Sequence, residues 1–381
     1  MLRRLNAQAV LDVLLAADEC DGTELMAATG LSRPTVHGVC DDLIVQGLAV
    51  ERPIRAAALA RPGRPPRVYA LRSAAAHVVG VDMGEATVRV AVADLRGRIL
   101  AETALPFADR RMPAPARLAT LRNAVALALR EAAVAADDVR SVVLGVPAPV
   151  TAAGYAVAAD TYLPGLAAVD LRGTLRPVLD APVTVENDAN LAVLAERWVG
   201  VAAGHDDAVL VLAGERLGAG LCLGGRLVRG HAGGAGEMGF LGLVSGVGDP
   251  TGVGRLLRHW TGQPAQDVFA RARRGESAAL DELDRVAGRV GRALAVLAMV
   301  LDPEVVVLGG GVADAGAVLM DPLRRAYAAT LHERPLRATP ALLASTLADR
   351  GSLLGAVRVA LDELLPRLID LEAAAVPVAR T

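Results

Sequence analysis

The sequence contains a unit of strand, glycine turn and strand twice, and this repeat limits the possible folds more than any other feature. The first copy is VVGVDMGEATVRVAVADLRGRILAE at residues 78–102, and the second is AVLVLAGERLGAGLCLGGRLVRG at residues 208–230. Apolar and polar residues alternate within the predicted strands, as in VRVAVAD. Helical segments follow each copy, so we predict an internally duplicated α/β fold with two lobes and a cleft between them.

Two later segments complete this prediction. EVVVLGGGVADAG at residues 304–316 predicts a third strand that ends in a glycine turn. Residues 353–365 have the pattern of an amphipathic helix, which we expect to pack back on the first lobe and to end or kink at Pro366. The predicted domains are residues 1–72, 73–195 and 196–381.

Residues 1–72 predict a small helical unit in front of the lobes. Its first helix has an apolar stripe that consists of Val10, Val13 and Leu14. The turn ATGLSRPTV then joins a second and a third helix in the manner of a helix-turn-helix. We expect Thr23 to cap the second helix, which ends at Gly30. Ser32 is expected to cap the third helix, which runs to about Gln46.

The third helix and the segment after it have the features of a DNA-binding winged helix. The buried face of the helix is predicted to comprise Val36, Val39, Cys40 and Leu43. The side chains expected to contact DNA from its outer face and N-terminus are Ser32, Arg33, Thr35 and His37. Two short strands at residues 48–51 and 67–71 flank an arginine-rich hairpin, and the arginines expected to anchor this wing on phosphate are Arg61, Arg64 and Arg67.

The charge balance supports this interpretation. Residues 33–72 contain seven arginines and three acids, a local balance of +4, whereas the whole chain of 381 residues has a formal net charge of −2. The overall charge argues against nucleic-acid binding by the chain as a whole. We therefore expect nucleic-acid binding to be confined to the basic segment, residues 33–72. The alternative is that the three helices are an ordinary packing unit with a solvated hairpin.

Composition also indicates where the protein works. Three cysteines, at 20, 40 and 222, have no disulfide or metal-ligand spacing, which is typical of a reducing compartment. The N-terminus is predicted to be an amphipathic helix and not a signal peptide, and the longest apolar run, residues 293–301, is too short to span a bilayer. We therefore expect a soluble cytoplasmic protein.

Seven runs of sequence, taken in order, resemble the ROK family (repressors, open reading frames and kinases) over nearly the whole chain. They are GLSRPTVHGVCDDLIVQGL, GRPPRVYAL, GVDMGEATVRVAVADLRG, GVPAPV, VENDANLAVLAE, GHAGGAGEMGF and VVVLGGGVADAG. The resemblance implies a winged helix-turn-helix followed by a two-lobed, actin-like sugar-kinase fold. Family members with this front end are usually sugar-responsive transcriptional regulators.

The resemblance also implies a sugar site. The acid of the family signature binds sugar hydroxyls, which here implies Glu237 within HAGGAGEMGF, whose glycines we expect to let the backbone approach a ligand. The Asn-Asp pair of the catalytic segment corresponds to Asn187 and Asp188. In a kinase, Asp188 would take the proton of the primary hydroxyl. Asp188 has an alternative role as the N-cap of the helix that follows it.

The phosphate turns depart from the kinase pattern. The residues that correspond to the nucleotide site are Asp82, Gly84, Glu85, Gly214, Glu215 and Gly310. Glu85 stands where family kinases have a glycine, and Glu215 and Arg216 interrupt a Gly-Thr-Gly turn. Two like charges about 4 Å apart repel by roughly 4 kcal/mol at an intermediate dielectric. We therefore predict that ATP binding is lost or weak, with Arg216 able to offset one carboxylate.

The segment that corresponds to the zinc loop of the family also departs from the kinase pattern. Phe240 replaces the histidine that ends the signature, and VSGVGDPTGVGRLLRHW replaces the cysteine-rich loop without any cysteine. Leu257 aligns with a sugar-binding glutamate, and we do not expect His259 to be a ligand. We predict no structural zinc and no other cofactor.

Together these observations favour a DNA-binding regulator, a repressor, whose lobes bind a sugar without phosphorylating it. We expect a homodimer on a palindromic operator, because one short winged helix seldom binds tightly enough alone. One alternative is an ATP-dependent sugar kinase that carries a DNA-binding domain. Another is a regulator whose cleft binds no sugar and whose lobes only mediate dimerisation.

Overall fold

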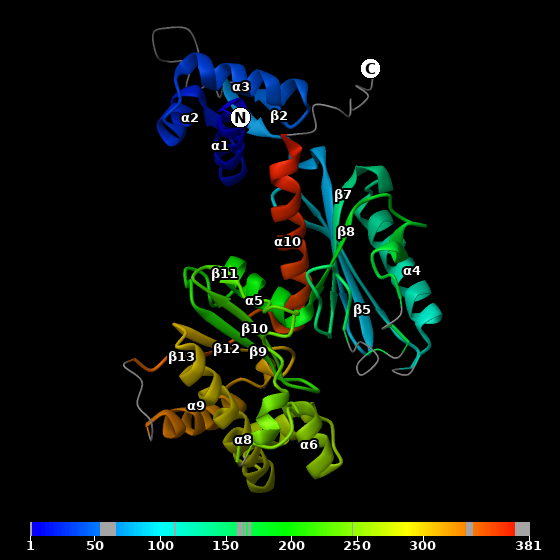
Figure 1. Cartoon of the computed structure of the whole chain (residues 1–381), viewed down its shortest axis with the longest axis vertical. Helices are drawn as coiled ribbons and strands as arrows, with labels where there is room; N and C mark the ends of the chain where they lie inside the picture. The colour runs from blue at the N-terminus through cyan, green and yellow to red at the C-terminus, as the bar shows by residue number, and fades with distance from the viewer. Residues whose placement is uncertain are drawn as a thin grey trace.

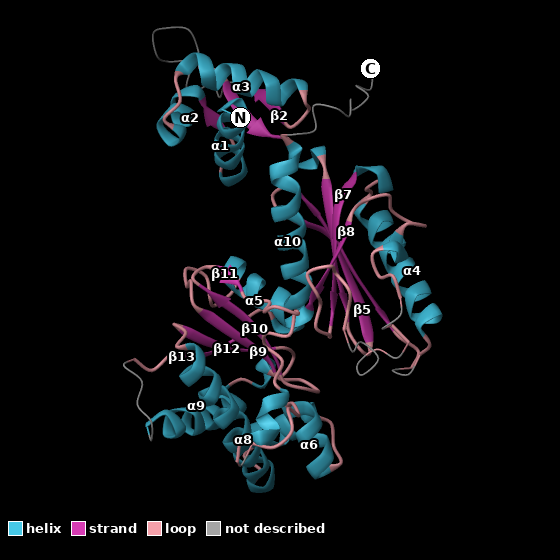
Figure 2. Ribbon diagram, viewed as in Figure 1, coloured by secondary structure: helices cyan, strands magenta, loops and turns pink. Residues whose placement is uncertain are grey.

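The computed structural model of the chain describes residues 2–53, 66–109, 112–157, 163, 165–166, 169–245, 247–332 and 338–369. A small helical unit lies at one end of the molecule, and two lobes follow along its long axis (Figure 1). Figure 2 shows that each lobe contains a sheet with helices packed against it.

The N-terminal unit consists of three helices and a small sheet with strand order β1-β3-β2. Its elements are α1 (Leu2–Ala16), β1 (Cys20–Asp21), α2 (Gly22–Thr29), α3 (Arg33–Val45), β2 (Ala49–Arg52) and β3 (Val68–Leu71). The predicted buried face of α3 is confirmed, since all four of its apolar residues are buried. The two predicted strands are also present, each shifted by one residue at its start.

The helix caps of this unit differ in part from the prediction. Asp21, and not Thr23, caps α2: its Oδ1 accepts hydrogen bonds from the backbone N–H groups of Thr23 (2.7 Å) and Glu24 (2.9 Å). Glu24 in turn accepts from the backbone N–H of Asp21 at 2.8 Å, which completes a capping box. Gly30 ends α2 in the left-handed conformation (φ 69°), as predicted.

The first lobe is built on a five-stranded sheet with the order β6-β5-β4-β7-β8. Its elements are β4 (His77–Met83), β5 (Thr87–Asp94), β6 (Ile99–Pro106), α4 (Ala114–Ala132), β7 (Val139–Val146), β8 (Val183–Asn187) and α5 (Asp188–Val199). The strands β4, β5 and β6 are antiparallel, and β7 and β8 run parallel to β4.

The second lobe repeats this topology with the order β11-β10-β9-β12-β13. Its strands are β9 (Ala208–Leu212), β10 (Gly218–Leu223), β11 (Arg226–Leu227), β12 (Val305–Gly309) and β13 (Ala341–Ala344). Its helices are α6 (Val253–Thr261), α7 (Ala265–Arg273), α8 (Ser277–Leu301) and α9 (Ala317–His332). Again the first three strands are antiparallel and the last two are parallel to the central strand. The predicted duplication is confirmed.

The chain crosses between the lobes twice, and buried polar contacts join the two crossings. Glu196, which is fully buried near the end of α5, accepts a hydrogen bond from the backbone N–H of Val201 at 2.8 Å in the first crossing. Its other carboxylate oxygen accepts from the hydroxyl of Ser345 in the second crossing. This carboxylate therefore links the two segments in which the chain passes between the lobes.

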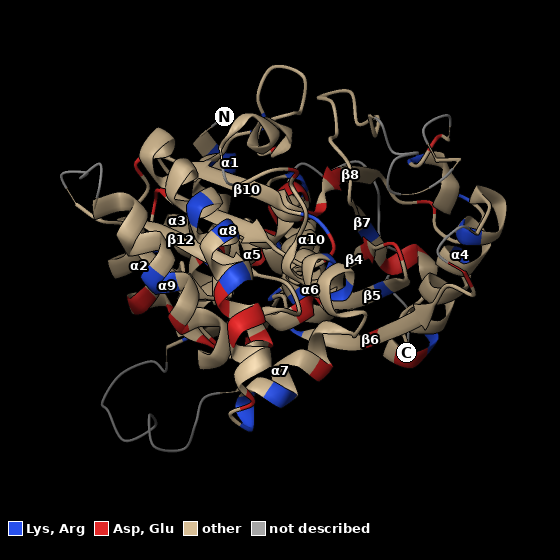
Figure 3. Ribbon diagram, turned by 90° about the horizontal axis from the view of Figure 1, so that it is seen from below, with Lys and Arg blue, Asp and Glu red and all other residues tan. Residues whose placement is uncertain are grey.

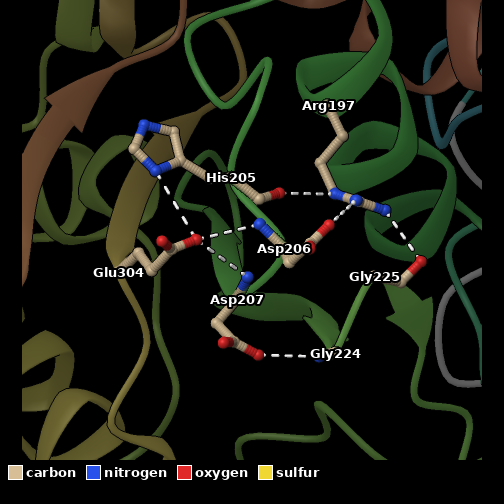
Figure 4. Close-up of polar contacts among 7 residues, drawn as sticks. All are labelled: Arg197, His205, Asp206, Asp207, Gly224, Gly225 and Glu304. Carbon is tan, nitrogen blue, oxygen red and sulfur yellow. Dashed lines mark hydrogen bonds and ion pairs between the residues drawn. The ribbon is translucent and has the colours of Figure 1, made fainter.

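A surface network fixes the end of the first crossing (Figure 4). Arg197 donates to the carbonyl oxygens of His205 (2.8 Å) and Gly225 (3.0 Å) and to the carboxylate of Asp206 (3.0 Å). Glu304, just before β12, accepts from the backbone N–H of Asp206 at 2.8 Å. The network holds the start of β9 between α5 and β12. The helices of the second lobe carry a mixture of basic and acidic residues on the face seen in Figure 3.

The last helix, α10 (Gly351–Leu368), returns to the first lobe, as predicted, and passes between its sheet and α5. The close contact with α5 requires glycine at position 355, because a Cβ there would overlap the carbonyl oxygen of Leu191. The helix continues for two residues past Pro366, so of the two predicted effects, an end or a kink, the end is wrong. In the last turn, the missing proline N–H removes one helix hydrogen bond and leaves the rest in place.

One hydrophobic core joins the N-terminal unit, the first lobe and α10. It includes Leu11 and Leu14 of α1, Ala93 of β5, and Leu361 and Leu364 of α10. Arg96, in the turn between β5 and β6, donates to the carbonyl oxygens of Leu14 (3.0 Å), Leu15 (2.8 Å) and Ala17 (2.6 Å) at the end of α1. The N-terminal unit is therefore held on the first lobe by apolar packing and by this arginine.

Candidate functional site

A cavity of about 330 Å³ lies between the lobes and brings together most residues of the predicted sugar and nucleotide sites. The predicted residues that line it are Asn187, Asp188, Glu237, Glu85, Gly214, Glu215 and Gly310. The other lining residues are Ala86, Pro147, Leu212, Arg216, Leu217 and Gly218. Asp82 and Gly84 are not part of this lining, although they belong to β4 and the turn that leads to Glu85.

Asn187 caps the helix that presents Asp188 to the cavity. Its Oδ1 accepts from the backbone N–H groups of Ala189 (3.0 Å) and Asn190 (3.1 Å), and its Nδ2 donates to the carbonyl oxygen of Ala148 (3.1 Å). The alternative in which Asp188 is the N-cap is therefore wrong, because Asp188 is the first residue of α5. Asn187 therefore caps α5, and Asp188, the first residue of the helix, lines the cavity.

Two aspartates of the cleft, Asp188 and Asp82, have raised pKa values. Burial raises the pKa of Asp188 to about 7, and the negative charges of Asp82 and Glu237 add to this rise. Burial also raises the pKa of Asp82 to about 6. A carboxyl group with a pKa near 7 is able to accept and release a proton at neutral pH.

An ion pair between a buried carboxylate and an exposed arginine, for which the sequence holds little signal, ties the Asn-Asp segment to the signature loop. Glu186, 4% exposed, accepts from Nε of Arg229 at 2.6 Å and from Nδ2 of Asn190 at 2.9 Å. Arg229 comes directly before the glycine-rich stretch that contains Glu237. Because a buried carboxylate needs such partners, the pair fixes the two segments relative to each other. The only signal in the sequence is an acid beside the Asn-Asp pair.

Two glycines of the signature, Gly233 and Gly236, pack against the protein's own backbone and not against a ligand, whereas a Cβ at Gly234 or Gly239 would meet no atom within 4 Å. Gly233 (φ 78°) and Gly236 (φ 89°) have left-handed conformations. A Cβ at Gly233 would overlap the carbonyl oxygen of Val150, and one at Gly236 would overlap that of Ala219. The loop is therefore pressed onto both lobes, and it holds Glu237 at the cavity.

A buried arginine that gave no signal in the sequence holds the first phosphate turn, at Gly84 and Glu85. Arg117 of α4 is fully buried, and its Nη1 donates to the carbonyl oxygens of Gly84 (3.2 Å) and Glu85 (3.1 Å). Its guanidinium lies 4.1 Å from the ring centroid of Phe107. Burial lowers the pKa of Arg117, and the carboxylate of Glu85 opposes that effect. The turn therefore has a positive charge next to Glu85.

The N-terminus of helix α6 is hydrogen-bonded to the backbone of the second phosphate turn. The backbone N–H groups of Gly252, Val253 and Gly254 donate to the carbonyl oxygens of Glu215 (3.1 Å), Ala213 (2.8 Å) and Gly214 (2.9 Å), respectively. Arg258, one turn further along α6, forms an ion pair with Glu215. The ion pair shows that Arg258, which the sequence did not single out, neutralises Glu215; that Arg216 is able to offset one of the two carboxylates stays a prediction.

The Glu215–Arg258 pair lies between two cavities. Glu215 and Gly214 line the first cavity and also a second one of about 410 Å³, which Arg258, Ala265 and Gly311 help to line. A ligand that extended from one cavity into the other would pass this ion pair. The structure thus places a charged pair across the region that corresponds to the nucleotide site of family kinases.

Both named residues of the segment that replaces the zinc loop lie in α6. Leu257 is fully buried in α6, and His259 is exposed. Among the described residues, no group of three or more His, Cys, Asp or Glu side chains is arranged to hold a metal ion. Phe240, in the short 3-10 turn Gly239–Leu243, is 40% exposed.

The helix-turn-helix presents some of the predicted DNA contacts at its surface. Ser32 and Arg33 are exposed at the start of α3, and Thr35 is half-buried. Ser32 occupies the N-cap position but makes no capping hydrogen bond; its hydroxyl instead bonds to that of Thr35 at 2.8 Å. This corrects the prediction that the Ser32 side chain caps α3. Arg61 and Arg64 lie outside the described residues.

Two of the predicted DNA contacts have partners inside the N-terminal unit. His37 is half-buried, and its Nδ1 hydrogen-bonds to the hydroxyl of Tyr69 at 2.7 Å. Arg67 pairs with Asp41 (2.6 Å) and Glu51 (2.8 Å) and lies over the ring of Tyr69. Both side chains join α3 to the sheet, so His37 does not point outward as expected, and the contacts of His37 and Arg67 with DNA stay predictions.

Comparison with known proteins identifies the two parts of the chain. Residues 78–363 match the ROK family, and residues 5–53 match the IclR helix-turn-helix domain. The chain therefore belongs to the ROK family and has an IclR-type helix-turn-helix at its N-terminus.

Individual relatives include both enzymes and regulators. The glucokinase of Streptomyces coelicolor is 28% identical over 320 residues, which covers 74% of this chain and 96% of the relative. The xylose repressor of Caldicellulosiruptor bescii is 21% identical over 401 residues, which covers 96% of this chain and 97% of the relative. A solved ROK family transcriptional regulator, a homologue of the MLC protein of E. coli, superposes with a TM-score of 0.76 at 20% identity, covering 97% of this chain and 98% of that one. At this identity the last likeness shows the fold alone.

None of the helices in the described part of the chain combines the length and the hydropathy needed to cross a membrane.

Proposed function

We propose that this protein is a DNA-binding transcriptional regulator, a repressor, that responds to a sugar and no longer acts as a kinase. The observation that carries this proposal is the presence of a helix-turn-helix and ROK lobes in one chain, joined by a continuous hydrophobic core. The similarity to a xylose repressor over nearly the full length of both chains supports it. A regulator of transcription would act in the cytoplasm.

The DNA-binding surface of this proposal is the N-terminal half of α3. Arg33 is exposed at the first helical position, beside exposed Ser32 and half-buried Thr35. The C-terminal half of α3 carries Asp41 and Asp42, which form ion pairs with Arg67 and Arg3 within the N-terminal unit. Arg61 and Arg64 remain the candidates for phosphate contact by the wing.

The effector site is the cavity between the lobes, where Asn187, Asp188 and Glu237 would bind sugar hydroxyls. Closure of the lobes on a sugar would change the position of the second lobe relative to α10 and the N-terminal unit. In a homodimer, this change would alter the spacing of two DNA-binding heads on a palindromic operator. The ligand would act by binding the two lobe arrangements with different affinities.

The DNA-binding part is tested with duplexes selected by the protein from a random library. We expect specific binding that weakens steeply with salt, and Arg33→Ala should lower affinity for the selected sequence about 10- to 100-fold with relaxed base preference. Arg255→Ala, an exposed arginine on α6, is the matched control and should bind like the wild type. Mobility-shift titrations at two salt concentrations measure both. Wild-type binding by the Arg33 variant would rule out the proposed docking of α3.

A specific observation also favours a second candidate function, an ATP-dependent sugar kinase with a DNA-binding domain. The pKa of Asp188, about 7, suits a general base, and a glucokinase is among the relatives. A coupled assay of ADP release across common hexoses distinguishes the two candidates. Turnover that disappears in Asp188→Ala would establish the kinase, and its absence with every hexose is the outcome expected for a regulator.

A further inference from the structure

The carboxylate of Glu186 lies at the junction of the two segments that carry the acids of the effector site. One of its oxygens, Oε1, accepts hydrogen bonds from the backbone N–H of Asn187 (2.9 Å) and from Nδ2 of Asn190 (2.9 Å). These two residues stand on either side of Asp188 at the start of α5. This oxygen therefore holds the turn that brings Asp188 to the cavity.

The second oxygen of the same carboxylate holds the signature loop through an arginine. Oε2 of Glu186 accepts from Nε of Arg229 at 2.6 Å. The carbonyl oxygen of Arg229 accepts from the backbone N–H of Ala235 at 3.1 Å. Glu237 follows two residues later, and its N–H donates to the carbonyl oxygen of Gly234 at 3.3 Å. Arg229 is thus bonded by its side chain to Glu186 and by its main chain to the loop that holds Glu237.

The Glu186–Arg229 pair bridges the two lobes behind the cavity. Glu186 belongs to β8 of the first lobe, and Arg229 follows β11 of the second. Neither residue is among the described residues that line the cavity, whereas Asp188 and Glu237 both line it. The carboxylate is buried, but the arginine side chain is 47% exposed. Water is therefore able to replace the guanidinium if the arginine is shortened.

A sugar that is held by two carboxylates requires them at a fixed separation. Hydrogen bonds between hydroxyl groups and carboxylates have donor–acceptor distances of about 2.5 to 3.0 Å, so a shift of about 1 Å in one acid breaks its bond to the ring. Asp188 and Glu237 come from different lobes, and their negative charges repel each other, which contributes to the raised pKa of Asp188. The bridge from Glu186 to Arg229 opposes this repulsion.

We infer that Arg229 is a positioning residue of the effector site: through Glu186 it sets where Asp188 stands relative to Glu237, although its own side chain does not touch the ligand. Loss of the bridge weakens the bound sugar without removing any group that binds it, because the ligand then has to order the two acids itself. This inference rests on the proposed function, since it concerns the site at which the regulator binds its sugar.

The experiment is calorimetric titration of the full chain with glucose, galactose, mannose and xylose. The sugar that binds the wild type most tightly is the probe for the variants. Arg229→Ala should weaken it about tenfold, and Arg229→Lys, which keeps a positive donor for Glu186, should stay within about threefold of the wild type. Arg226→Ala, an exposed arginine on β11 three residues earlier, is the matched control and should bind like the wild type.

A double-mutant cycle shows whether Arg229 acts through Glu186. Glu186→Gln keeps an acceptor for Asn187 and Asn190, but its amide group is a donor and does not pair with the arginine. We expect this variant to weaken the sugar about tenfold. The double variant with Arg229→Ala should also be weakened about tenfold and not a hundredfold, because both changes break the same link. Thermal unfolding of every variant defines a titration temperature at which all of them are folded.

Several results would overturn the inference. Wild-type affinity in Arg229→Ala would show that the arginine does not position the site, and a hundredfold loss in the double variant would show that it does not act through Glu186. A lysine variant as weak as the alanine variant, or a wild type that binds none of the four sugars, would also overturn it.

Binding of the wild type to its selected DNA, measured in parallel, separates this failure from that of the proposed function. Specific DNA binding beside an unaffected Arg229 variant would leave the regulator in place and remove only the positioning role. Absence of specific DNA binding would contradict the proposed function itself.

Discussion

Asp188 combines burial with two acidic neighbours, and both raise the free energy of its ionised form. Its pKa rises to about 7, whereas an aspartate in an unfolded chain has a pKa of about 3.9. The folded protein therefore holds this proton more tightly than the unfolded chain does. The stability that this carboxyl group contributes is present below about pH 4 and is lost as the pH rises to about 7.

Asp188→Asn should consequently stabilise the protein at alkaline pH. The amide has no charge to bury, so we expect the free energy of unfolding to rise by about 1 to 3 kcal/mol at pH 8. The difference from the wild type should shrink between pH 7 and pH 4 and vanish below it. Denaturant unfolding at several pH values measures this, with Asp180→Asn as the exposed control. A stability difference that did not depend on pH would contradict the electrostatic explanation.

Single side chains were the hardest features to predict from the sequence. The outward position of His37 and the phosphate contact of Arg67 were inferred from helix and hairpin geometry, but their partners Tyr69, Asp41 and Glu51 are brought together only by the tertiary fold. Arg117 and Arg258 gave no local signal either, because every basic residue of this chain is an arginine. Their roles depend on the turns they meet, at residues distant in sequence.

At the scale of elements, the prediction was much closer to the structure. The strand and turn patterns of β4–β5 and β9–β10 are local, since alternation and glycine turns are encoded within about 20 residues. The fold duplication therefore followed from the sequence alone. The contact partners of the signature glycines did not, because Val150 and Ala219 belong to other segments, one in each lobe.

The signature loop provides a matched test of this packing. Gly236→Ala would force a left-handed alanine and overlap the carbonyl oxygen of Ala219, so we expect a loss of about 3 kcal/mol in stability. Gly234→Ala is the control, since a Cβ there would meet no atom within 4 Å and its φ is not in the left-handed range. Thermal unfolding compares the two variants. Equal melting temperatures would show that the loop relaxes away from β10.

The whole molecule depends on the attachment of the N-terminal unit to the first lobe. Arg96 donates three hydrogen bonds to the carbonyl oxygens that end α1, and Arg4 of α1 donates to the carbonyl oxygen of Pro366 in α10 at 3.4 Å. Nothing in the local sequence DLRGR distinguishes Arg96 from Arg98, two residues later. The attachment therefore could not be predicted from sequence patterns.

Arg96→Ala should loosen the N-terminal unit without unfolding the lobes. Loss of charge-assisted bonds worth about 2 kcal/mol corresponds to hydrogen exchange on the order of 30-fold faster in the last turn of α1. Mass spectrometry of exchange in the peptide 2–17 measures this, and exposed Arg98→Ala is the control. Unchanged exchange in the Arg96 variant would mean that apolar packing alone secures the unit.

The shared core beneath α1 has a consequence for protein engineering. Residues 2–72, excised or grafted onto a different sensor, would lose part of their own interior, because Leu361 and Leu364 come from the far end of the polypeptide. A functional chimaera would have to carry along the C-terminal helix, or an equivalent apolar floor. To exchange DNA-binding domains between such regulators, both the N-terminal and the C-terminal coding segments of the gene therefore have to be replaced.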